Sequence, residues 1–247
     1  MSTVLSVQHL TKEYPKFTLK DISFSVEEGS VMGLIGRNGA GKTTTIKSIL
    51  RLIHATSGEI TFFGMDIAEQ ERAVKQQIGY AGGEVDYYKK KKIRQIVQVT
   101  KTFYSQWDDA AYRKYMDLFE IDEDKTPSEL SEGMKVKLNL VTSLSHGAKL
   151  LILDEPTSGL DPVSRDELLD VFRALAERGV AILFSTHITS DLDKCADSIT
   201  YIRKGKLQYS GSMRDYIEQN RAQGIGDNLE AIMLHYEKEN FHEKLAQ

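Results

Sequence analysis

The sequence is short of several features that would direct it to a particular cellular setting. It has a single cysteine, Cys195, so no internal disulfide can form and a reducing, intracellular environment is expected. Its cleanest apolar runs, 150–153 and 180–184, fall far short of the roughly 20 residues that a helix needs to cross a bilayer. Residues 1–4 lack both the basic flank and the apolar segment of a secretion signal. We therefore expect a cytoplasmic protein.

An excess of basic charge is also missing. The 247 residues carry 32 Lys and Arg against 36 Asp and Glu, which gives a net charge of −4. This balance argues against binding nucleic acid through bulk electrostatics, so we expect no nucleic-acid partner. Hydrophobic residues make up 40% and charged residues 28%, a mixture that can bury a core and stay soluble. The length allows one domain, or one core with a sizeable insert.

Strand-like and helix-like patterns alternate along most of the chain. Short strand-like runs fill residues 1–30, and apolar runs predict further strands at 31–36, 58–63, 75–80, 149–154 and 180–185. Helical spacing of apolar residues follows residue 42 and residue 161, and a last helix is expected to start at an Asp227-x-x-Glu230 capping box. Such alternation predicts an α/β fold with a mostly parallel core sheet covered on both faces.

A helical stretch interrupts this alternation. Apolar residues keep helical spacing twice between 93 and 118, and a third helix is expected after Ser131. We therefore divide the chain into a first core part at 1–85, an inserted helical subdomain at 86–147, a second core part at 148–212 and a helical tail at 213–247. Lys204 and Gly205 are expected to form a hairpin turn within the second core part.

A glycine-rich turn between a predicted strand and a predicted helix carries the strongest chemical signal. Its residues fit G-x-x-x-x-G-K-[ST] without a mismatch: Gly36, Arg37, Asn38, Gly39, Ala40, Gly41, Lys42 and Thr43. The glycines let backbone N–H groups turn inward around phosphate oxygens, and the helix N-terminus adds partial positive charge. Lys42 would attract the outer phosphates, the Thr43 hydroxyl would bind magnesium, and the following Thr44 belongs to the same nucleotide-binding set.

Two carboxylates stand at the end of the strand predicted at 149–154, Asp154 as its last residue and Glu155 directly after it. In a phosphate-loop protein, a buried strand ending in an aspartate supplies the second half of the site, and Asp154 would hold the metal through its coordination shell. Glu155, one residue further, would polarise the attacking water as general base. The pair means little alone, but together with a matched phosphate loop it predicts nucleotide hydrolysis.

Three further segments complete a recognisable order. The stretch Leu130-Ser131-Glu132-Gly133-Met134 precedes the two carboxylates, and Ser158-Gly159-Leu160-Asp161 and Ser185-Thr186-His187 follow them. In this order the chain resembles the ATP-binding subunit of an ABC transporter over nearly its whole length. The resemblance implies an ABC-type P-loop ATPase fold, with an antiparallel β subdomain at the N-terminus and an inserted helical subdomain. It also implies ATP and Mg²⁺ as ligands.

The resemblance assigns roles to individual residues. Tyr14 would stack on adenine, or simply occupy a surface turn before Pro15. Ser131 and Gly133 would contact the γ-phosphate bound by the opposite protomer, and Asp161 would couple the two sites; Ser131 and Asp161 read equally as helix caps. His187 would touch the γ-phosphate together with the catalytic residues Lys42 and Glu155, although a lone histidine at a strand end is usually structural.

Two departures from the family pattern stand out. The position of a glutamine that usually binds the metal or the water aligns with Gly83, and we hypothesise that Glu84 or a water replaces it. The signature stretch carries Glu132 and Met134 where Gly and Gln are commoner, and Lys135 and Lys137 are expected to offset the added charge. The basic run 89–92 is either solvated or in contact with a membrane subunit or anionic headgroups.

The resemblance predicts an energising subunit rather than a complete transporter. Two ATPase protomers, identical or different, would close on two nucleotides and drive a separate integral membrane permease, holding the chain at the inner face of the membrane. Finer features, including the Phe103–Asp108 segment, are similar to ABC-2-type exporters of Gram-positive bacteria, which move peptides, antimicrobials or lipids. The alternative is a soluble ABC ATPase of the iron–sulfur assembly type. An unrelated P-loop kinase would leave Ser131, Asp161 and His187 unexplained.

Overall fold

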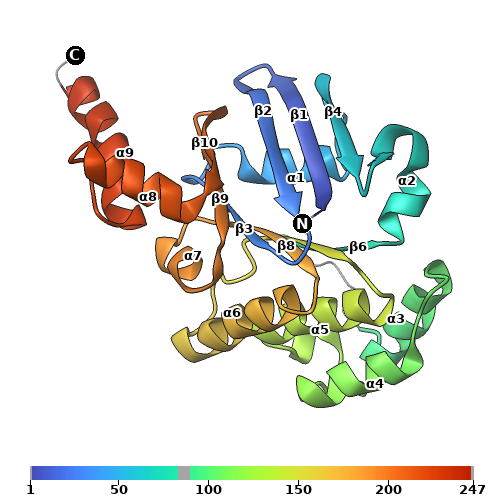
Figure 1. The fold of residues 1–247 in the computed structure, drawn as a ribbon. Helices are drawn as coiled ribbons and strands as arrows, with labels where there is room; N and C mark the ends of the chain where they lie inside the picture. The colour runs from blue at the N-terminus through green and yellow to red at the C-terminus, as the bar shows by residue number, and fades with distance from the viewer. Residues whose placement is uncertain (1, 83–89, 246–247) are drawn as a thin grey trace.

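The computed structural model describes residues 2–82 and 90–245, with side chains up to Lys238 (Figure 1). Within these residues the strands form one sheet in the order β5-β4-β1-β2-β10-β9-β3-β8-β7-β6. The strands are β1 (Thr3–Tyr14), β2 (Phe17–Glu27), β3 (Val31–Ile35), β4 (Ser57–Phe62), β5 (Met65–Asp66), β6 (Ile78–Gly82), β7 (Leu150–Asp154), β8 (Ala181–Thr186), β9 (Ser198–Arg203) and β10 (Lys206–Ser212).

Helices are inserted between most of these strands. They are α1 (Lys42–Ile49), α2 (Ile67–Lys75), α3 (Ile93–Thr100), α4 (Asp109–Leu118), α5 (Glu132–Ser145), α6 (Pro162–Ala176), α7 (Thr189–Cys195), α8 (Met213–Ala222) and α9 (Leu229–Leu245). Helices α3 to α6 lie below the sheet in Figure 1, and α8 and α9 lie at its upper left. None of the helices in the described part of the chain combines the length and the apolar composition needed to cross a bilayer.

The sheet has a parallel part and an antiparallel part. Strand β3 pairs in parallel with β8 on one side and β9 on the other, and β8, β7 and β6 continue the parallel order. Strands β1, β2, β4 and β5 pair only antiparallel with one another. The two parts meet where β10 runs beside β2 at the pair Lys206–Lys20. This confirms the α/β fold class, including the antiparallel N-terminal strands.

Strand β7 shows how the sheet separates two hydrophobic cores. Successive side chains of a strand point to opposite faces. Leu150 and Ile152 pack with the apolar side of α1, in the core that also includes β1, β2 and β4. Leu151 and Leu153 pack instead with buried residues of α5 and α6. The parallel strands are thus covered on both faces, and the polar residues that follow β3, β7 and β8 emerge together at one edge.

Several predicted boundaries need correction. The strand predicted at 75–80 begins only at Ile78, because residues 67–75 form helix α2, capped by the Asp66 side chain that accepts from Ala68 N. The last helix does not begin at an Asp227 box, since Asn228 is the residue whose side chain accepts from Ala231 N at 2.9 Å. The hairpin at Lys204 and Gly205 is confirmed. Helix α7, of 7 residues, was not predicted, whereas α8 lies within the predicted helical tail at 213–247.

Candidate active site

A cavity of about 540 Å³ opens beside the glycine-rich turn between β3 and α1. It lies where the carboxyl ends of β3, β7 and β8 meet, the usual position of a ligand site in a parallel sheet. Its walls come from the turn, from the loops after β7 and β8, and from the start of β2. The lining residues are Phe17, Arg37, Asn38, Gly39, Gly41, Lys42, Thr43, Thr44, Glu155, Ser158 and His187.

Two glycines of the turn adopt backbone conformations that other residues rarely reach. Gly41, directly before α1, has φ 119°, and a Cβ there would lie 2.8 Å from Cδ1 of Leu19. Gly36 has φ 155°, and a Cβ would lie 2.3 Å from the carbonyl oxygen of Ile202. Neither position has space for a Cβ, and residues other than glycine rarely adopt these φ angles. A side chain at either position would therefore displace the turn that is expected to wrap around phosphate.

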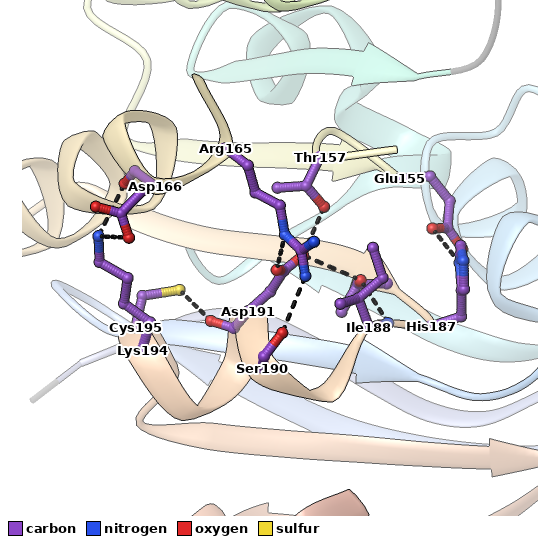
Figure 2. Close-up of polar contacts among 11 residues, drawn as sticks. Glu155, Thr157, Arg165, Asp166, His187, Ile188, Ser190, Asp191, Lys194 and Cys195 are labelled. Atoms are coloured by element: carbon purple, nitrogen blue, oxygen red, sulfur yellow. Dashed lines mark hydrogen bonds and ion pairs between the residues drawn. The ribbon is translucent and has the colours of Figure 1, made fainter. Parts of the chain in front are cut away.

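Lys42 and Glu155 form the charged centre of the cavity. The Lys42 ammonium is 5% exposed, donates to the Gly36 carbonyl at 2.8 Å and lies 3.0 Å from Oε1 of Glu155. The other carboxylate oxygen of Glu155, Oε2, lies 2.8 Å from Nδ1 of His187 (Figure 2). The structure therefore brings together the three residues that the sequence predicts to be catalytic, with the carboxylate between two nitrogen groups.

The two carboxylates at the end of β7, Asp154 and Glu155, have different surroundings. Asp154 is buried at 9% exposure and accepts a 2.6 Å hydrogen bond from the Ser185 hydroxyl. The same hydroxyl accepts from Glu155 N, so Ser185 ties both residues to β8. Glu155 itself has φ 54°, which turns its side chain away from the strand direction and into the cavity. Sequence order alone gives no hint of this turn.

The oxygen groups predicted to bind magnesium are a hydroxyl and a carboxylate. Among the residues that the structure describes, no three or more His, Cys, Asp or Glu side chains are grouped to hold a metal ion. Mg²⁺ usually takes only one or two protein oxygens and completes its shell with water and substrate phosphates. The Thr43 hydroxyl at the cavity wall is one such oxygen. The Asp154 carboxylate at the end of β7 is the second one predicted, and it lies behind Glu155 rather than among the described residues that line the cavity.

Three predicted site residues lie outside this cavity, at helix starts. The Ser131 hydroxyl caps α5 by accepting from Met134 N at 3.2 Å, and a Cβ at Gly133 would lie 3.3 Å from Cδ2 of Leu160. The Asp161 carboxylate caps α6 by accepting from two backbone N–H groups, and hydrogen bonds with Ser164 lower its pKa. Their alternative role as structural elements is thus observed, and their predicted contact with a partner's nucleotide stays a prediction.

The aromatic residue at the cavity is not the one that the sequence singled out. Tyr14 is 42% exposed, has the Lys12 ammonium 5.1 Å from its ring centre, and is not among the described residues that line the cavity. Phe17, its partner across the β1–β2 turn, does line it. The sequence assigned no role to Phe17, although it is aromatic and lies only three positions after Tyr14 in the same hairpin. It also gave no role to Ser158, which lines the cavity after Glu155.

The positions that depart from the family pattern lie partly within the described residues. Gly83, Glu84, the boundary at residue 86 and Lys89 lie outside the described residues. Further along the basic run, Lys92 pairs with Asp124 at 2.9 Å. In the signature stretch, Lys135 pairs with Glu132 at 2.6 Å as expected. Lys137 does not share this role, because it pairs with Glu167 on α6 at 3.0 Å.

Comparison with known proteins agrees with this geometry. Residues 19–158 match the family model described as ABC transporter. The ABC transporter ATP-binding protein YtrB of Bacillus subtilis (strain 168) is 37% identical over 190 residues, which cover 76% of this chain and 65% of the relative. The bacitracin transport ATP-binding protein BcrA of Bacillus licheniformis is 33% identical, with 84% and 69% covered. The lantibiotic transport ATP-binding protein SrtF of Streptococcus pyogenes is 35% identical, with 85% and 93% covered.

Solved structures lead to the same class. The structure of an ATP-binding subunit of an ABC transporter superimposes with a TM-score of 0.83 at 28% identity, and the match covers 94% of this chain and 98% of that one. A nucleotide-free ATP-binding cassette matches with a TM-score of 0.76 at 21% identity, which supports the fold alone. The fold and the site thus define an ATP-binding cassette. The chain belongs to the ABC transporter family, which confirms the resemblance stated from sequence.

Proposed function

We propose that the chain binds ATP and Mg²⁺ in the cavity beside the glycine-rich turn, hydrolyses the ATP, and thereby drives export through a separate membrane permease. The observation that carries this proposal is the meeting of Lys42, Glu155 and His187 around one cavity. Phosphate binding alone would need Lys42 and the turn. A carboxylate held beside the same phosphate position adds the group that hydrolysis requires.

Each residue then has a defined task. Backbone N–H groups from Gly39 to Thr43 would surround the phosphates, with the Lys42 ammonium on the outer ones. Thr43 and Asp154 would hold Mg²⁺, which neutralises the charge that develops on the β- and γ-phosphate oxygens. Glu155 would accept a proton from the attacking water while the water oxygen bonds to the γ-phosphorus and ADP leaves. His187 orients this carboxylate through its 2.8 Å contact.

The remaining site residues fit a head-to-tail dimer of cassettes. Ser131 stands at the start of α5, where a hydroxyl and free backbone N–H groups form an anion site. Gly133 lies two residues further along, and a Cβ there would lie 3.3 Å from Cδ2 of Leu160, in the loop that leads to Asp161. In the proposed dimer these residues would face the γ-phosphate held by the partner, whether that partner is identical or a related cassette. Tyr14 or Phe17 would stack on the adenine.

An exporter role is supported by the relatives' functions. BcrA is a bacitracin transport protein and SrtF a lantibiotic transport protein. In line with these names, we propose a peptide, antimicrobial or lipid-like cargo for this chain. A permease partner would hold it at the inner face of the cell membrane. None of the relatives named above is an iron–sulfur assembly ATPase.

The proposal can be tested by trapping the dimer on its partner. A tagged Glu155→Gln variant, expressed in the native cell and purified in mild detergent with ATP, should retain an integral membrane protein in stoichiometric amount. Mass spectrometry identifies that protein, and the wild-type chain purified without ATP is the control. Recovery of soluble scaffold proteins alone would overturn the transporter proposal in favour of an assembly ATPase.

A further inference from the structure

A buried carboxylate next to the candidate active site has no task in the reaction described above. Asp191 lies on α7 and is 1% exposed, which makes it one of the few charged side chains in the interior. An ionised carboxylate in such a place is stable only when every oxygen has good partners. The identity of these partners therefore shows what the residue holds in place.

The partners of Asp191 come from three separate segments of the chain (Figure 2). Its Oδ1 accepts a hydrogen bond from Nε of Arg165, near the start of α6. Its Oδ2 accepts from the Thr157 hydroxyl at 2.6 Å, and from the Thr186 hydroxyl at 3.4 Å. Arg165 reaches the same helix a second time, because its Nη2 donates to the Ser190 hydroxyl at 2.9 Å.

The positions of these partners along the chain connect Asp191 to the catalytic residues. Thr157 follows Glu155 by two residues, and Thr186 directly precedes His187. Both threonines are buried, at 1% and 0% exposure, so neither hydroxyl can turn to water instead. Thr186 Oγ1 also accepts from Ile188 N at 3.0 Å, which fixes the backbone on the other side of His187.

We propose that Asp191 is a positioning residue that clamps the loop bearing Glu155 to the strand end bearing His187. The proposal rests on the catalytic roles proposed above for those two residues. The Asp191 carboxylate binds Thr157, two residues after Glu155, and Thr186, one residue before His187. These two hydrogen bonds therefore maintain the 2.8 Å contact between Glu155 and His187. Arg165 anchors the clamp to α6, the helix that Asp161 caps.

The setting makes this clamp stiff. Hydrogen bonds to an ionised group are stronger than neutral ones, and a low local dielectric strengthens them further. Loss of the charge would let the Thr157 loop and the His187 strand end move independently. A displacement of about 1 Å at a catalytic group can reduce turnover about 100-fold without changing which residues are present.

The test separates positioning from folding and from substrate binding. Asp191→Asn keeps the shape but removes the charge, while Thr157→Val and Thr186→Val each remove one donor and leave the charge intact. In steady-state ATPase assays of the whole chain, we expect kcat to fall about 10- to 100-fold in Asp191→Asn and in the Thr157→Val, Thr186→Val double variant. The affinity for ATP, measured by fluorescence titration, should stay within about twofold, because the phosphate loop is untouched.

A control from the same helix pair is available. Lys194, also on α7, pairs with Asp166 at 2.6 Å and Asp170 at 2.8 Å on α6 without touching either active-site loop. Lys194→Gln should therefore leave both kcat and ATP affinity unchanged. A loss of kcat in Lys194→Gln equal to that in Asp191→Asn would show that any weakened contact between α6 and α7 has this effect, and would overturn the proposal.

The outcomes distinguish this inference from the proposed function. Unchanged kcat in a folded Asp191→Asn chain, or in the double threonine variant if Asp191→Asn does not fold, overturns the clamp. Glu155→Gln is assayed alongside: if it keeps wild-type turnover, the proposed catalytic assignment fails first. A fall in kcat at constant ATP affinity in the Asp191 and threonine variants, with inactive Glu155→Gln and active Lys194→Gln, supports the clamp.

Discussion

Oε1 of Glu155 lies 3.0 Å from Nζ of Lys42, so the proposed general base is paired with the cation that is expected to bind phosphate. The two interactions compete: a phosphate oxygen bound to Lys42 must share or replace the carboxylate. Glu155 therefore lowers the affinity of Lys42 for phosphate, and the same side chain provides the group that is proposed to activate water. The effect of removing its charge therefore differs between binding and turnover.

Glu155→Gln should bind ATP several-fold more tightly than the wild type and hydrolyse it about 100- to 10,000-fold more slowly. The amide keeps the size of the side chain but neither neutralises Lys42 nor accepts a proton. Isothermal titration with ATP and a phosphate-release assay measure the two quantities. Glu167→Gln, which removes a carboxylate paired with Lys137 on the surface, is the matched control and should change neither. Wild-type turnover in Glu155→Gln would remove Glu155 from the role of base.

Lys42→Ala should lose most of the affinity for ATP, because the buried Lys42 ammonium is the motif lysine that is expected to bind the outer phosphates. Lys47→Ala, one turn further along the same helix on its exposed side, should bind ATP normally. Equilibrium binding of a fluorescent ATP analogue measures both variants. Equal affinities in the two would contradict the proposed position of the phosphates.

Phe17→Ala should weaken ATP binding by about 1–3 kcal/mol, the usual contribution of a base stacked on an aromatic ring. Tyr14→Ala is the matched variant, and a smaller effect there would identify Phe17 as the adenine contact. Inorganic triphosphate serves as a probe without a base, and its affinity should be the same in both variants. A larger loss in Tyr14→Ala would restore the role that sequence resemblance assigned to that residue.

His146 should make the fold less stable at acidic pH. Burial lowers its pKa, its ring stacks on Tyr104 with centroids 3.8 Å apart, and its Nδ1 has no hydrogen-bond partner among the described residues. Because the unfolded chain takes up the proton at higher pH than the folded chain, stability is present above the ordinary histidine pKa of about 6.5 and falls as pH drops below it.

Urea denaturation between pH 5 and 8 checks this expectation. His146→Phe keeps an aromatic ring against Tyr104 and removes the titration, so its unfolding midpoint should depend less on pH below 6.5 than that of the wild type. His54→Phe, at an exposed position, should leave the pH dependence unchanged. An identical pH dependence in wild type and His146→Phe would contradict the stated effect of burial.

The sequence predicted those parts of the site that are encoded by local patterns. A glycine-rich turn and a strand ending in Asp154 and Glu155 depend on neighbouring residues, and the structure places Lys42, Glu155 and His187 together. Phe17 was missed because the sequence does not show that the cavity reaches the start of β2, where Phe17 lies, rather than the end of β1, where its cross-strand partner Tyr14 lies. The sequence suggested no role for Asp191, because its hydrogen-bond partners lie 5, 26 and 34 residues away along the chain.

The boundaries that were wrong have a similar cause. Helix α2 has only two buried residues, Ile67 and Val74, so it lacks the broad apolar stripe by which helices are recognised. The strand that follows was therefore extended too far toward the N-terminus. The capping residue of α9 was missed because Asp227 and Asn228 are both good caps, and their order alone does not show which one meets the helix.

The left-handed backbone of Glu155, at φ 54°, has a consequence for how the chain tolerates change. A residue with a side chain usually adopts this conformation at a cost of about 1–3 kcal/mol, whereas glycine adopts it freely. Glu155→Gly would therefore relieve the backbone while removing the reactive carboxylate. The same change would leave the buried Lys42 ammonium without the carboxylate that lies 3.0 Å from it. The strained backbone at Glu155 and its ion pair with Lys42 are therefore gained or lost together.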